Sequence, residues 1–101
     1  MSADVDALAD QLIRHLEENG VPADRFTTGP GTAGINIWGE AGRYPLTSVT
    51  ISDSGRFHDY AWGPRYEHTL PIDTPPEQVA AAVLEAVTTL TNQTAQQGET
   101  R

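Results

Sequence analysis

Residues 47–62, TSVTISDSGRFHDYAW, decide the fold of this chain. Apolar and polar residues alternate on both sides of Asp53-Ser54-Gly55, and such alternation around a Gly-containing turn is typical of a β-hairpin. We therefore predict two antiparallel strands here. On the second strand His58, Tyr60 and Trp62 share one side, and the residues between them share the other.

The chemistry of the turn leaves two registers open. If residues 53–55 form a three-residue loop with Gly in the left-handed bulge position, Ile51 faces Phe57 and Val49 faces Asp59. The aromatic side of the second strand is then on the face away from the core. We favour this register because Gly at the third loop position is a common bulge signal.

If Ser54-Gly55 is instead a two-residue turn, Ile51 faces His58 and Val49 faces Tyr60. A shift by one residue exchanges the two faces of a strand. The aromatic side then belongs to the core. The register therefore determines which side chains are available to a partner.

Amphipathic helices are predicted on both flanks of the hairpin. Apolar residues recur at helical spacing over residues 5–16, with Ser2 or Asp4 as N-cap and Asn19-Gly20 as a stop signal. Residues 74–77, TPPE, combine an N-cap Thr with Pro and Glu in the first turn, and a second apolar stripe follows.

The remaining segments complete the sheet. Residues 35–38, INIW, predict a short first strand, and the Gly-, Pro- and Thr-rich residues 22–33 before it predict a loop. Residues 66–72 are extended or form a short edge strand. The order α-β-β-β-α predicts an α+β fold of two layers, in which a three-stranded antiparallel sheet carries both helices on one face.

The chain length of 101 residues suits one domain. We assign residues 1–91 to a single α+β domain. Residues 92–101, NQTAQQGETR, are polar and predict a disordered C-terminal tail.

This element order resembles that of the double-stranded-RNA-binding domain, over nearly the whole chain and in topology alone. The resemblance implies a two-layer fold with both helices on one face. That family binds phosphates with a basic cluster at the start of its last helix, whereas residues 73–78, DTPPEQ, contain no Lys or Arg. We therefore expect no nucleic-acid partner.

The composition narrows the class of function. Fourteen acidic against six basic residues give a net charge of −8, which disfavours binding to nucleic acid or anionic membrane. There is no cysteine, which excludes disulfides and thiolate ligands. The acidic N-terminus lacks the features of a signal peptide, and no stretch is apolar enough to span a bilayer. We expect a cytoplasmic protein.

Titratable residues gather between positions 58 and 68. A pocket around His58, Asp59, Tyr66 and His68 would allow general-base chemistry or ligand binding. No nucleophile motif accompanies these residues, and the spacing of the two histidines matches no standard metal site. Residues 29–34 match GxGxxG literally but lie before a strand, so no cofactor is predicted.

The favoured register instead predicts an exposed aromatic cluster, which is typical of an interface. Its anchors are Trp38, Tyr60 and Trp62, with His58 and Arg65 as a polar rim. The main hypothesis is a small non-catalytic interaction domain that binds a protein partner or itself through this sheet face. The alternatives are the small enzyme or ligand-binding domain above and an acidic nucleic-acid mimic.

Overall fold

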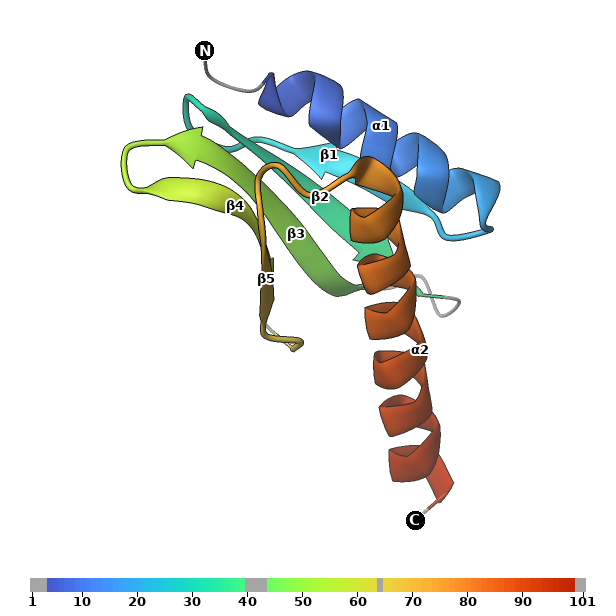
Figure 1. Ribbon diagram of the computed structural model, residues 1–101. Coiled ribbons are helices and arrows are strands. Elements are labelled where there is room, and N and C mark those ends of the chain that lie inside the picture. The colour runs from blue at the N-terminus through green and yellow to red at the C-terminus, as the bar shows by residue number, and fades with distance from the viewer. Residues whose placement is uncertain (1–3, 40–43, 64, 100–101) are drawn as a thin grey trace.

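An antiparallel sheet of five strands forms one layer of the molecule, and two helices form the other (Figure 1). The computed structural model describes residues 4–39, 44–63 and 65–99, with side chains up to residue 93. The elements in chain order are α1 (Val5–Glu18), β1 (Ala23–Phe26), β2 (Thr32–Trp38), β3 (Pro45–Ser54), β4 (Phe57–Gly63), β5 (His68–Pro71) and α2 (Pro76–Glu99). The strands lie in the order β1-β2-β3-β4-β5, so each pairs with its sequence neighbour.

The sheet has two strands more than predicted. The part of the predicted loop that forms β1 pairs with β2 through Ala23↔Ile37 and Phe26↔Gly34, and β5 pairs with β4 at the other edge. The α+β class is confirmed, whereas the three-stranded sheet and the topology of the double-stranded-RNA-binding domain are not matched. The strand β1, ADRF, has no β-branched residue, which removed the usual strand signal.

The core lies between the helices and a single sheet face. Its strand residues are Ile35, Ile37, Val49, Ile51, Tyr60 and Trp62, and its helix residues include Leu12, Leu16, Val79 and Val83. All of these are buried, which requires one face of each central strand to point toward the helices. The opposite face of the sheet has no helix over it, as Figure 1 shows.

The hairpin register differs from both predicted registers. Ile51 pairs with Tyr60 and Val49 with Trp62, and the loop consists of Gly55 and Arg56 alone. Gly55 has a φ of +60°, as the first position of a type II′ turn requires. The prediction that the aromatic side of β4 faces away from the core is therefore wrong. Tyr60 and Trp62 are buried, as in the alternative with a two-residue turn, although the residue pairs differ.

The helix ends follow the capping signals. The Asp4 carboxylate accepts hydrogen bonds from the backbone N–H groups of Asp6 and Ala7 at 3.1 and 3.2 Å. The other predicted N-cap, Ser2, lies outside the described residues. At the other end Gly20 has a φ of +78°, and the Val21 N–H donates to the Leu16 carbonyl at 2.9 Å, as in a Schellman motif.

The second helix begins at Pro76, one residue later than the N-cap at Thr74 implied. It continues to Glu99, so that residues 92–99 of the predicted tail are helical, and residues 100–101 lie outside the described residues. Side chains 91–93 are exposed. The C-terminal part of α2 projects beyond the sheet (Figure 1).

Candidate functional site

The uncovered surface of the sheet is the largest feature that the fold leaves without a packing layer. We call it the helix-free face. The cross-strand pairs define its members, which are Asp24, Phe26, Thr32, Gly34, Asn36, Trp38, Ser48, Thr50, Ser52, Phe57, Asp59, Ala61, Gly63, Thr69 and Pro71.

The centre of the helix-free face is flat and uncharged. One row across the sheet contains Gly34, Thr50, Ala61 and Thr69, none of which has a long side chain. Ser48 and Ser52 lie beside this row on β3. Because the side chains of Thr50, Ala61 and Thr69 are short, another backbone or side chain can come close to the sheet at these three residues.

Aromatic residues surround this flat centre. Phe26 and Trp38 are half-buried, and the Phe57 side chain is 65% exposed. Gly34 leaves the space that the Phe26 ring occupies, since a Cβ at residue 34 would overlap the ring. The face therefore combines aromatic margins with a small, hydroxyl-rich centre.

Asp59 and Arg65 have opposite charges and lie at opposite ends of this face, with Asp24 of β1 in the row of Asn36 and Ser48 at the Arg65 end. Asp59 is on β4 near the β3–β4 turn. Arg65 follows the other end of β4 and lines a hollow of about 270 Å³ with Asn36, Leu46 and Ser48. Among the described residues neither Asp59 nor Arg65 has an ion-pair partner.

Hydroxyl groups organise the sheet beside this hollow. Ser48 Oγ and Thr47 Oγ1 both donate to the Gly63 carbonyl, at 2.9 and 3.0 Å. On the neighbouring strands Asn36 Nδ2 donates to Asp24 Oδ1 at 3.1 Å. These bonds fix the end of β4 from which the chain proceeds to Arg65.

The predicted interface residues are divided between the two sides of the sheet. Trp38 follows Asn36 by two residues on β2 and is half-buried, and a register shift separates its pair with Pro45 from the rest of the ladder. Arg65 is exposed beside Asn36 and Ser48 of the helix-free face. Tyr60 and Trp62 are 1% and 6% exposed and belong to the core, so their predicted place on the open face is wrong. The reason is the register, which pairs them with Ile51 and Val49.

His58 lies at the exposed end of β4 on the helix side. Its Nδ1 is 2.6 Å from Asp53 Oδ1, and its Nε2 is 3.1 Å from the Gly55 carbonyl. Both neighbours are acceptors, and only the imidazolium has N–H groups on both nitrogens. The bond to Asp53 raises the pKa of His58 above its ordinary value of 6.5.

The residues of the predicted pocket do not come together. His68 of β5 pairs with Trp62 of β4, which is four residues from His58. Four strand residues span about 13 Å, so the two histidines are far apart. Asp59 points to the opposite face. Tyr66 does lie near His68, with ring centroids 6.0 Å apart, and His68 contacts the edge of Trp62.

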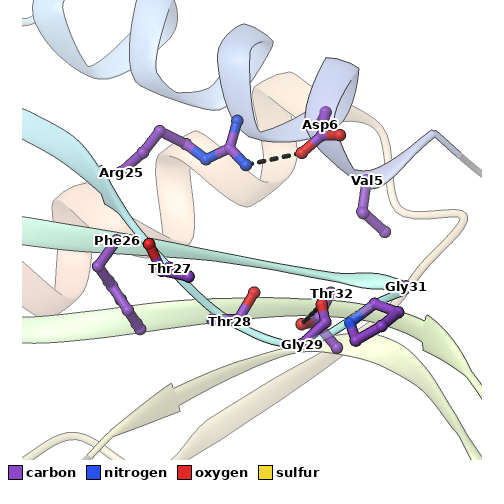
Figure 2. Close-up of a pocket in the computed structure, with 10 residues that line it drawn as sticks. Val5, Asp6, Arg25, Phe26, Thr27, Thr28, Gly29, Gly31 and Thr32 are labelled. Atoms are coloured by element: carbon purple, nitrogen blue, oxygen red, sulfur yellow. Dashed lines mark hydrogen bonds and ion pairs between the residues drawn. The ribbon is translucent and has the colours of Figure 1, made fainter.

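A second hollow, of about 550 Å³, lies between the start of α1 and the β1–β2 loop (Figure 2). Arg25 crosses it and binds Asp6 Oδ1 at 2.7 Å, with Asp10 Oδ1 at 3.6 Å. The literal GxGxxG motif forms part of its floor as a turn between strands, with Gly31 at a φ of +73°. Among the described residues that line this hollow Arg25 is the one cationic group, and it already pairs with two carboxylates.

The acidic residues are spread over several elements. Exposed acidic residues lie on both helices. On α1 and its N-cap they are Asp4, Asp6, Asp10, Glu17 and Glu18, and on α2 they are Glu77 and Glu85. Only Asp24 and Asp59 belong to the helix-free face. Most of the described negative charge is therefore in the helical layer.

No described helix combines the length and apolar character needed to cross a membrane. Comparison of the chain with known protein families, with curated proteins and with solved structures finds no significant match.

Proposed function

We propose that this chain is a cytoplasmic, non-catalytic protein-interaction domain that docks through the helix-free face of its sheet. The observation that carries the proposal is the chemistry of this face. Its central row consists of Gly34, Thr50, Ala61 and Thr69, and partly exposed aromatic rings lie at its margins. Interfaces are enriched in aromatic residues and depleted of charge at their centre.

The comparison with an ordinary solvated sheet supports this proposal. The solvated face of an antiparallel sheet is commonly polar, and charged surface side chains act against association. The described strands place no Lys, Arg or Glu on the helix-free face. A surface without such side chains favours contact with another protein.

The sheet edges are poorer docking sites than the face. Each edge strand has four residues. β1 carries the charged pair Asp24 and Arg25, and β5 ends at Pro71, which has no N–H to donate. Short edges with charge or proline resist strand addition, so the face is the favoured surface.

Single-cysteine variants test the proposal, because the natural chain has no cysteine. Thr50→Cys places a label at the centre of the helix-free face, and Thr88→Cys places the same label on the exposed side of α2. Each purified variant is labelled with benzophenone maleimide and irradiated in an extract of the source cells.

We expect crosslinked adducts of higher mass from the Thr50→Cys protein and none from the Thr88→Cys protein. Mass spectrometry separates adducts with a second copy of the chain from adducts with another protein. Adducts from the Thr88→Cys protein alone, or no adduct from Thr50→Cys, would contradict docking through the helix-free face.

A further inference from the structure

We infer that the occupant of the helix-free face is a second copy of this chain, related to the first by a two-fold axis. This inference rests on the proposed function, because it names the partner of the same surface. The observation behind it is the placement of Asp59 and Arg65 at opposite ends of the face.

The two residues are separated along the strand direction. Asp59 pairs with Ser52 near the turn end of β3, whereas Arg65 lies beyond Gly63, which pairs with Ser48. Asp59 and Gly63 are four residues apart, or about 13 Å along a strand. The hollow that Arg65 lines with Asn36 and Ser48 places it at the far end of the helix-free face.

A two-fold axis in the plane of the interface, running across the strands near Thr50, exchanges these ends. Asp59 of one copy then lies opposite the Arg65 end of the second copy, and the same contact forms twice. This is the self-complementary pattern of an isologous dimer. Both side chains lack an ion-pair partner within the described part of one chain, which leaves them available for it.

The centre of the face permits this approach. Sheets that pack face to face lie about 10 Å apart, with short side chains interdigitating. Thr50 and Ala61 would lie on the axis, with the Phe26 ring over Gly34 beside them. Phe26 and Phe57 at its margins would lose contact with water on association, which is favourable.

The charge distribution also agrees with a second copy. The chain has a net charge of −8, and two such chains repel each other if their acidic surfaces meet. The five exposed acidic residues of α1 lie in the helical layer. Face-to-face pairing of the sheets therefore puts these charges on the two outer sides of the dimer.

A charge-swap series tests this dimer by analytical ultracentrifugation. We expect the unmodified protein to be a dimer, and Asp59→Arg or Arg65→Asp to raise its dissociation constant at least about tenfold, since each brings like charges together twice. The double variant restores the opposite pairing and should return the constant to near its original value. Glu85→Arg, a charge reversal on the exposed side of α2, is the control and should leave dimerisation intact.

A second measurement covers the case in which a charge variant fails to fold. Nitroxide labels on Thr69→Cys, an exposed position on the edge strand of the helix-free face, should give a short distance between copies by pulsed electron paramagnetic resonance, and labels on Thr88→Cys a longer one. A monomeric unmodified protein, or a double variant as weak as the single variants, would overturn the inference. A monomer whose Thr50→Cys label still crosslinks to a different protein would overturn the dimer and leave the proposed function standing.

Discussion

Phe26 of β1 covers Gly34 of β2 on the helix-free face, and the two residues form a direct cross-strand pair. The ring takes the place that a side chain at residue 34 would fill. This contact joins the short edge strand β1 to the sheet through a side chain as well as through the backbone.

Gly34→Ala should therefore destabilise the protein. The new methyl group displaces the Phe26 ring, and overpacking of this kind costs about 1–3 kcal/mol in the free energy of unfolding. Urea denaturation followed by circular dichroism measures the change. In a Phe26→Ala background the same substitution should cost less, by at least about 0.5 kcal/mol, because contacting residues are coupled. Equal losses of stability in both backgrounds would show that the Phe26 ring does not restrict the size of the side chain at residue 34.

The outcome at the hairpin shows what the sequence could predict and why the rest was missed. The two strands were predicted correctly from alternation around Gly55, but the turn was placed at residues 53–55, whereas Asp53 and Ser54 are paired in the sheet. The register was wrong because the glycine was placed last in a three-residue loop, whereas it is first in a two-residue loop. The sequence did contain a signal for the correct register. That register pairs the apolar residues Val49 and Ile51 with the large aromatic residues Trp62 and Tyr60.

A pair of substitutions on β4 tests the observed faces. Trp62→Ala removes a core side chain that is 6% exposed and should lower the free energy of unfolding by about 3–5 kcal/mol. Phe57→Ala removes a ring that is 65% exposed and should change it by no more than about 0.5 kcal/mol. Thermal and urea unfolding give both values. Similar losses for the two variants would contradict the register.

The candidate site was harder to predict than the fold, since it depends on which residues of distant strands share a face. Trp38 and Arg65 were named as interface residues from the sequence, whereas Phe26, Gly34 and Thr50, which belong to the proposed surface, were not. Phe26 lay in a stretch predicted to be a loop, and a glycine beneath an aromatic ring has no local sequence signal. Only the pairing of β1 with β2 brings these two residues together.

Truncation after residue 91 tests the role of the last turns of α2. Among the side chains described on α2, the last buried one is Leu90, which is 4% exposed, and side chains 91–93 are exposed. A chain ending at Thr91 should therefore unfold at nearly the same temperature as the full chain, within the few degrees that small surface changes cause. A loss of cooperative unfolding would instead assign residues 92–101 to the folded domain.

The contact of His58 with Asp53 predicts a pH dependence of stability. The bond raises the pKa of His58 in the folded state, so its stabilisation is fully present below about pH 6.5 and is lost as the pH rises through the folded pKa. The free energy of unfolding of the natural protein, measured relative to His58→Gln, should decrease over that interval. Using the difference removes the contributions of the other histidines.

Asp53→Asn provides the matched control for this pH effect. The carboxylate bond is the largest cause of the raised pKa, so the substitution should lower the pKa of His58 toward its ordinary value. A titration of the His58 ring protons by NMR measures it directly in both proteins. An unchanged pKa in the Asp53→Asn protein, or a stability difference that grows as pH rises, would show that this ion pair does not hold the hairpin turn.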